Sequence, residues 1–403
     1  MSEPSAPEEY VRLALLIDRW FPGYVDAYYG PQQVRASINA GDKPSIATLK
    51  DLAGSLQRSI SDDSSLSPNR RAYLKEELRA MRTTIHILAG DPPAFVNEVE
   101  SLYGVTPKWV DESIFAEAHR VLNEVLPGSG SLRERVMGFK ERSRVTAEVA
   151  EPIIRRLVEL LRGRTAALFG LPAGEDCEVT FVRDKPWIAY NWYLGDYKSH
   201  IDFNQDVPIE MWSLPYTVAH EIYPGHHTEF AIKEQRLYRG EGRPEHSILL
   251  SNTPSSLVSE GIAENGLEAV ANEDEIAAIM KDCYEDAALP RDDAARVMDF
   301  IKAYRLEKVT DNQVLLLYRD HAPDNEIINY GIRYGLMDEE QGQHLLRFCR
   351  DPLSRSYTYN YTLGRDLVAV FLAQADAKTE AFRQLLYEPF TPTQILQSLG
   401  SRI

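Results

Sequence analysis

The chain has 403 residues, of which 44% are hydrophobic and 26% charged, and its formal net charge is −17. This composition is typical of a globular protein, with enough length for two or three domains or for one large body with a smaller lobe. The negative charge argues against a nucleic-acid partner, because surfaces that bind nucleic acids are basic.

Three widely spaced cysteines, Cys177, Cys283 and Cys349, predict reduced thiols rather than a disulfide framework. No apolar run reaches the ~20 residues that span a bilayer, and residues 1–5 lack the basic and apolar segments of a signal peptide. We therefore expect a cytoplasmic protein with no membrane partner.

Apolar residues recur with helical spacing through the first 170 residues, and turns with Pro and Gly, such as Leu126-Pro127-Gly128, interrupt them. The pattern predicts helices at 7–20, 45–60, 68–89, 93–104, 110–124, 130–144 and 148–169. We expect residues 1–170 to form an N-terminal helical part that covers a cleft.

After Gly170 the periodicity changes to the alternation of short strands. The predicted strands are 178–183, 187–192 and 198–203. Helical patterns then return at 209–223, 226–238, 254–272, 274–285, 291–307, 312–319, 324–335, 338–349, 360–375 and 378–387. The whole pattern predicts a mostly α (α+β) fold, whose catalytic part (171–403) holds a small sheet (171–205), helices at 209–272 and C-terminal helices.

The segment at 217–230, TVAHEIYPGHHTEF, places His220, Glu221, His226 and His227 within eight residues. A His-Glu pair followed by another His is similar to the zinc-peptidase motif HExxH. In that motif both His bind zinc from one helix face, and the Glu is the general base.

The spacing here differs from that motif. In an unbroken helix His226 would lie ~120° from the face of His220, and His227 would lie ~10 Å along the axis. Neither could share an ion with His220 at ~2.0–2.1 Å per bond. Pro224 interrupts helical hydrogen bonding and Gly225 tolerates unusual backbone angles, so we expect a bulge that brings a later His back.

HEIYPGHH resembles the HExxPGHH signature of a large bacterial family, the domain-of-unknown-function family number 885. That family is regarded as zinc metallopeptidases, related in plan to thimet oligopeptidase and the carboxypeptidase Taq group. The matching Gly225-His226 favours His226 over His227 as second ligand, and a longer bulge would reverse this choice. With two further blocks, the resemblance covers roughly residues 185–375. It implies one zinc ion per chain and a large helical zincin-like body, with a small antiparallel sheet beside the metal-binding helix.

Downstream, Ser259-Glu260-Gly261-Ile262-Ala263-Glu264 resembles the EGxA block of the same family. The resemblance makes Glu260 the third zinc ligand. Glu264, one helical turn on, is the expected hydrogen-bond acceptor behind a ligand His. Without the resemblance, Glu260 and Glu264 would read as the solvated face of an acidic helix.

Tyr361-Thr-Leu-Gly364 resembles the YxxG element of the family, which makes Tyr361 the expected donor to the oxyanion. Arg365 lies four residues on and is a candidate for binding a substrate carboxylate. The resemblance also makes the strand around His200 the sheet edge that pairs with substrate.

Glu229 reads as an ordinary surface carboxylate, and His227 as a residue that orients substrate or packs. The sequence therefore predicts a zinc-dependent metallohydrolase with Glu221 as general base and peptides as substrates. Arg365 suggests carboxypeptidase action. The alternatives are a non-catalytic binding protein on a peptidase fold and a metal hydrolase of a non-peptide amide. The sequence favours no particular oligomeric state.

Overall fold

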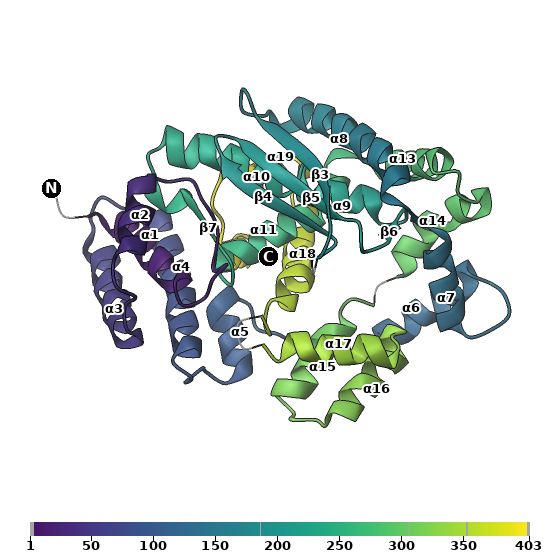
Figure 1. Ribbon diagram of the computed structural model, residues 1–403, viewed down its shortest axis with the longest axis horizontal. Helices are drawn as coiled ribbons and strands as arrows, with labels where there is room; N and C mark the ends of the chain where they lie inside the picture. Colours follow the sequence, from purple (N-terminus) through teal and green to yellow (C-terminus); the bar gives the residue numbers. More distant parts are fainter. Residues whose placement is uncertain (1–3, 186, 305, 352–353, 401–403) are drawn as a thin grey trace.

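The computed structural model describes residues 4–185, 187–304, 306–351 and 354–400, and most of them are helical (Figure 1). In this part of the chain, strands occur in three small sheets. The predicted mostly α, α+β class is therefore confirmed. Within the described ranges, no helix is both long and apolar enough to cross a membrane.

The first helices form a layer at the left of Figure 1, and the last of them also packs into the second hydrophobic core. They are α1 (Ala6–Asp18), α2 (Gln32–Ala40), α3 (Ile46–Asp62), α4 (Pro68–Leu88) and α5 (Phe95–Tyr103). Helix α4 begins after Ser67, whose hydroxyl accepts the Arg70 N–H, with Pro68 in the first helical position. The buried faces of α1, α3 and α4 share one hydrophobic core with strands β1 (Val25–Tyr28) and β7 (Ile248–Leu250), which pair antiparallel.

A second, larger hydrophobic core holds the rest of the molecule together. It includes α6 (Glu112–Val125), α7 (Leu132–Arg142) and α8 (Ala147–Phe169) together with the C-terminal helices. The cores thus divide the chain differently from the expected boundary at residue 170. An amphipathic pattern shows which face of a helix is buried, but not which partner covers it.

The main sheet has three strands in the order β3-β5-β4: β3 (Asp176–Val182), β4 (Ala189–Gly195) and β5 (Lys198–Asn204). All three predicted strands are present. The sheet is mixed, however, since β3 pairs parallel with β5 and β4 pairs antiparallel with it. The expectations of an antiparallel sheet and of an edge strand around His200 are therefore wrong. Alternation identifies a strand but not its neighbours, and β5 is the central strand.

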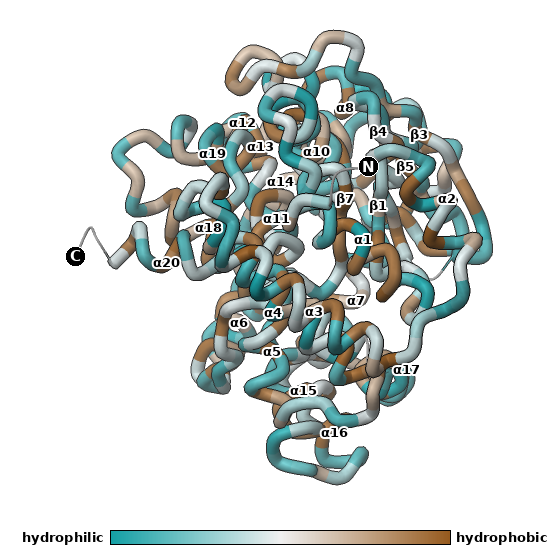
Figure 2. Tube along the Cα trace, turned by 90° about the vertical axis from the view of Figure 1, so that its left-hand side faces the viewer, coloured by the Kyte–Doolittle hydropathy of each residue, from teal (hydrophilic) through white to brown (hydrophobic). Residues whose placement is uncertain are grey.

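The remaining helices are α9 (Leu214–Glu221), α10 (His226–Lys233), α11 (Pro254–Glu264), α12 (Gly266–Val270), α13 (Glu273–Asp286), α14 (Arg291–Ala303), α15 (Val309–Tyr318), α16 (Asp324–Gly335), α17 (Glu339–Cys349), α18 (Thr358–Ala373), α19 (Lys378–Tyr387) and α20 (Pro392–Gly400). The predicted helix 209–223 starts later, because β6 (Ile209–Glu210) pairs with β2 (Arg144–Val145). The predicted helix 254–272 is divided at Asn265. Hydrophilic and hydrophobic segments alternate along many of the helices, as amphipathic packing requires (Figure 2).

Candidate metal centre

The helix that carries His220 breaks and restarts at the second His. The Gly225 N–H donates to the carbonyl of Ala219, six residues back, at 2.9 Å, and the Thr228 N–H donates to that of Ile222, also six back, at 3.2 Å. An ordinary helix spans four residues per hydrogen bond, so the break absorbs two extra residues. The bulge expected at Pro224 is therefore present.

Gly225 is required at this break by close approach of the backbone. A Cβ atom there would lie 2.5 Å from the Ala219 carbonyl oxygen, and it would overlap the carbonyl oxygen of His220 still more severely. Neither backbone atom can move without disturbing α9 itself. Only glycine therefore fits at position 225, where the helix breaks.

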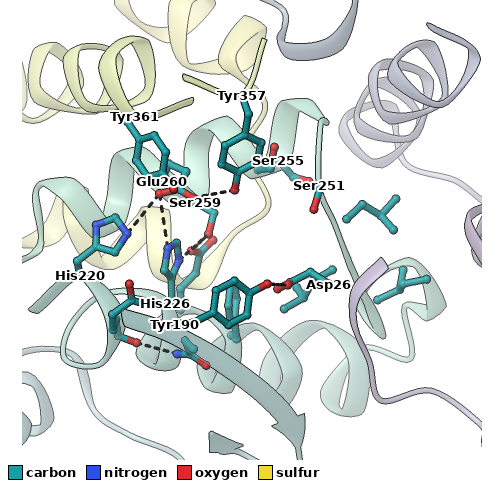
Figure 3. Close-up of a pocket in the computed structure, with 18 of the residues that line it drawn as sticks. Asp26, Tyr190, His220, His226, Ser251, Ser255, Ser259, Glu260, Tyr357 and Tyr361 are labelled. Atoms are coloured by element: carbon teal, nitrogen blue, oxygen red, sulfur yellow. Dashed lines mark hydrogen bonds and ion pairs between the residues drawn. The ribbon is translucent and has the colours of Figure 1, made fainter. Parts of the chain in front are cut away.

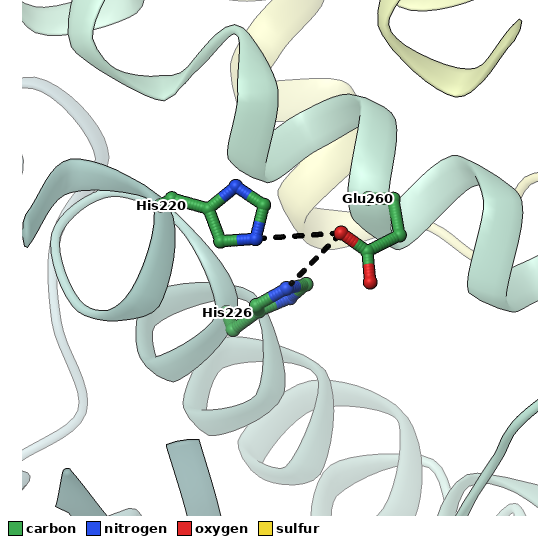
Figure 4. A group of neighbouring side chains, drawn as sticks. All are labelled: His220, His226 and Glu260. Atoms are coloured by element: carbon green, nitrogen blue, oxygen red, sulfur yellow. Dashed lines mark ion pairs between the residues drawn. The ribbon is translucent and has the colours of Figure 1, made fainter. Parts of the chain in front are cut away.

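The break brings His226 back to His220, and both imidazoles face Glu260 from α11 (Figure 4). Their Nε2 atoms lie 3.3 Å and 3.6 Å from Glu260 Oε2, with His220 the closer. One ligand atom from each of the three residues lies within 4.8 Å of the others. Ligands bound tetrahedrally at ~2.0–2.2 Å would be about 3.4 Å apart, so the two His–Glu distances fit a single ion.

Glu260 is placed by the close packing of α11 on α18. A Cβ on Gly261 would overlap the carbonyl oxygen of Gly364, and a Cβ on Gly364 would overlap that of Leu257. The two glycines therefore let the helix backbones touch. Tyr357, at the start of α18, donates its hydroxyl to Glu260 Oε1 at 3.0 Å, which leaves Oε2 for the histidines.

Polar contacts at Nδ1 of the two histidines determine which ring nitrogen faces Glu260. His220 Nδ1 lies 3.3 Å from Glu264 Oε1, and His226 Nδ1 lies 3.2 Å from Ser259 Oγ. Ser259 gives its own proton to Glu229 Oε2, at 2.6 Å, so it accepts from His226 Nδ1–H. With Nδ1 engaged in this way, Nε2 is the nitrogen of each ring that faces Glu260 and that a metal ion would bind.

The charges of the cluster also fit a cation. Burial alone would raise the pKa of Glu260, but the two imidazoles hold it well below its usual range. Burial would lower the pKa of His220, but contact with Glu260 and Glu264 raises it well above its usual value. Glu260 Oε2 is buried, with no hydrogen-bond partner among the described residues. Two imidazole nitrogens and one carboxylate oxygen are a ligand set that zinc accepts with a fourth position open.

Glu221 lies beside the cluster, at the C-terminal end of α9. Asn191 on β4 donates to its backbone carbonyl at 2.7 Å, which ties α9 to the sheet. In the described part of the chain, the Glu221 carboxylate has no hydrogen-bond or ion-pair partner. Burial raises its pKa, although His220 and His226 oppose the shift. A carboxylate with a raised pKa is suited to accept a proton near neutral pH.

The cluster opens into a cavity of 810 Å³ lined by residues of both hydrophobic cores. Figure 3 shows His220 and His226 on one side, with Tyr357 and Tyr361 beside Glu260. The Tyr361 ring lies 6.3 Å from that of His220, and its side chain is 42% exposed. No residue in the described ranges hydrogen-bonds to the Tyr361 hydroxyl, which leaves this donor available.

Two histidines named from the sequence lie outside the cavity. His227 is fully buried, with Nδ1 2.8 Å from Ser199 Oγ and Nε2 3.0 Å from Glu175 Oε2. His200 Nε2 lies 2.9 Å from Asp202 Oδ1 on the central strand. His227 therefore packs in the interior and does not line the cavity, and the expected placement of His200 on an edge strand is wrong.

Arg365 also points elsewhere. Its guanidinium lies 3.7 Å from Glu307 and 3.6 Å from Asp366, and it does not line the cavity. Four residues advance a helix by about 6 Å, which carries Arg365 past the cavity that Tyr361 lines. The structure therefore does not support a role in binding a substrate carboxylate.

Several residues of the site were not identified from the sequence. Glu229 is 2% exposed, so its assignment to the surface is wrong. Glu229 lies one helical turn after His226 and Tyr357 one turn before Tyr361, and these spacings were usable signals, whereas Ser259 simply precedes Glu260 in the sequence. Asp26 has no such signal, because the fold brings it to the cavity from a distant strand.

Comparison with known proteins supports the fold but assigns neither a family nor a function. No family description matches the chain, and no curated protein matches it. A solved structure from Colwellia psychrerythraea, provisionally described as a lipoprotein, has a TM-score of 0.53 at 13% identity, over 98% of this chain and 75% of its own. A structure from Shewanella oneidensis, described in the same way and as of unknown function, has a TM-score of 0.52 at 13% identity, over 95% of this chain and 80% of its own. Both support the mostly helical fold.

Proposed function

We propose that this chain is a zinc-dependent hydrolase that cleaves peptides, with His220, His226 and Glu260 as the metal ligands. The observation that carries the proposal is the convergence of these three side chains across the break at Gly225. The similarity of HEIYPGHH to the signature of the domain-of-unknown-function family number 885 supports the same conclusion.

Zinc held by these residues would lower the pKa of a water molecule and polarise a carbonyl group. The roles of the side chains follow from their positions. Glu264 and Ser259 hold the two imidazoles in orientation, and Tyr357 holds the Glu260 carboxylate. A ligand set held in this way is preorganised, because each of its side chains is oriented by a neighbouring polar group.

Glu221 would accept the proton of the attacking water. Its carboxylate has a raised pKa and adjoins the ligand His220. Tyr361 would donate a hydrogen bond to the oxyanion that forms on the scissile carbonyl, because its hydroxyl is available beside the cluster.

Substrate would lie along β4, not along β5 as expected from the sequence. Strand β4 pairs with β5 on one side only within its sheet, and its residues Ala189, Tyr190 and Asn191 line the cavity. An extended peptide adds to such a free edge through main-chain hydrogen bonds. The cavity has the volume of a pocket for a small ligand, so it would admit a short unfolded segment rather than a folded protein.

The test is digestion of a mixed peptide library by zinc-loaded protein, with Glu221→Gln and zinc-depleted protein as controls. The proposal predicts cleavage that both controls lack. Zinc at one ion per chain without cleavage would favour a non-catalytic binding protein. Cleavage of simple amides but not of peptides would indicate the non-peptide hydrolase.

A further inference from the structure

Asp26 is a carboxylate in the cavity that the proposed chemistry does not use. It lies on β1, in the N-terminal layer, and it lines the same cavity as Glu221 and His226. Figure 3 shows Asp26 facing Tyr190 across the cavity from Tyr357.

The backbone turns Asp26 out of the regular strand. In the pairing of β1 with β7, Val25 lies opposite Leu250 and Ala27 opposite Leu249, with a register shift between them at Asp26. A β-bulge of this kind leaves one residue unpaired and re-aims its side chain. The bulge is held in place because Asp18 accepts the N–H groups of both Gly23 and Val25 at 3.1 Å.

The charge of Asp26 has little compensation from the protein. The hydroxyl of Tyr190 donates a hydrogen bond to Asp26 Oδ1, and among the described residues no Lys or Arg forms an ion pair with it. Burial raises the pKa of Asp26, although Tyr190 and His226 oppose the shift. Keeping a desolvated carboxylate without a cation is costly, so this wall of the cavity favours a positive ligand.

The other charged groups of the cavity already have assigned contacts or lie at its exposed rim. Glu260 faces the histidines, Glu229 binds Ser259 and Lys233, and Glu221 adjoins His220. Arg347 is exposed on α17. Among the described carboxylates of the cavity, Asp26 thus has no assigned role, and it is available to bind substrate.

We propose that Asp26, oriented by Tyr190, binds an ammonium group of the peptide substrate. This inference rests on the proposed function and specifies its substrate class. The ammonium group has two sources, the free N-terminus of the peptide or a lysine side chain, and the arms of the experiment distinguish them.

The experiment measures peptide binding by calorimetry to zinc-supplemented Glu221→Gln protein, so that turnover is not needed. The probes are a short peptide with a free N-terminus and one lysine, its N-acetylated twin, and a twin with norleucine in place of lysine. Loss of one charge-assisted hydrogen bond is expected to weaken binding at least roughly tenfold in one of the two twins. A weaker acetylated twin identifies the N-terminus, and a weaker norleucine twin identifies the side chain.

Variants then assign the effect to Asp26. Adding Asp26→Asn should reduce the affinity for the parent peptide to that of the weaker twin, and adding Tyr190→Phe should reduce it partly. Asp42→Asn, an equal change of charge at an exposed site on the same layer, should have no effect. Equal binding of all three peptides, or a preference that survives Asp26→Asn, would overturn the proposal. Neither outcome depends on cleavage, whose absence bears on the proposed function alone.

Discussion

At the scale of single residues, the proposed function assigns Glu221 to catalysis and not to metal binding. Its carboxylate adjoins His220 but is not one of the three converging groups. We predict that Glu221→Gln retains bound zinc and thermal stability and lowers kcat by about 10²-fold or more, because an amide cannot accept the proton of water. Zinc content and peptide cleavage should be measured on the same preparation. Wild-type turnover by this variant would show that Glu221 is not the base.

The two tyrosines at the start of α18 should have different roles. Tyr357 bonds Glu260, whereas the Tyr361 hydroxyl is available to substrate. We predict that Tyr361→Phe lowers kcat about 10²-fold with zinc affinity unchanged. Tyr357→Phe should instead weaken zinc affinity by roughly tenfold. Competition with a chelator and steady-state kinetics would distinguish them, and identical effects in both assays would contradict the assignment.

At the scale of elements, the break between α9 and α10 creates the site. We predict that Gly225→Ala destabilises the fold by ~3 kcal/mol or more and abolishes zinc binding, because its Cβ has no room beside the Ala219 and His220 carbonyls. The matched control is Gly54→Ala in α3, where a Cβ meets nothing within 4 Å. That variant should be stabilised by about 0.5–1 kcal/mol. Denaturant unfolding measures both, and a tolerated Gly225→Ala would contradict the steric account.

Local chemistry made much of this element predictable. Pro224 and Gly225 indicate a break in the helix. The geometry of a regular helix shows that, without such a break, His220 and a second histidine could not bind the same ion. The resemblance supplied Glu260, and helical spacing supplied Glu264. The sequence did not reveal that β5 is central or that Arg365 points past the cavity, because strand order and helix rotation depend on tertiary packing.

At the scale of the whole molecule, the cavity lies where two hydrophobic cores meet, and a buried carboxylate joins them. Glu77 of α4 accepts the Ser255 N–H at 2.9 Å and the Tyr10 hydroxyl at 3.2 Å. Ser255 is in the first turn of α11, the helix that carries Glu260. The N-terminal layer thereby helps to position the helix that carries Glu260.

The buried Glu77 predicts a pH dependence of stability. Burial raises its pKa from 4.5 to about 7. The folded state therefore holds this proton more tightly than the unfolded state does. Its contribution of ~3 kcal/mol to the free energy of unfolding is fully present below pH 4.5 and is lost as the pH rises through 7.

Urea unfolding of Glu77→Gln across this range tests the prediction. Because the amide stays neutral, stability of the variant relative to wild type should rise by about 3 kcal/mol between pH 4.5 and pH 8. Glu100→Gln, at an exposed position, is the control and should follow wild type. Parallel curves for wild type and Glu77→Gln would contradict the role of Glu77.

The most direct test of the central claim is an anomalous-difference map, recorded on either side of the zinc absorption edge, from crystals grown with added zinc. The account predicts one peak per chain between His220 Nε2, His226 Nε2 and Glu260 Oε2, absent in His226→Ala. An empty cluster in zinc-supplemented wild-type protein, or a peak that His226→Ala retains, would contradict it.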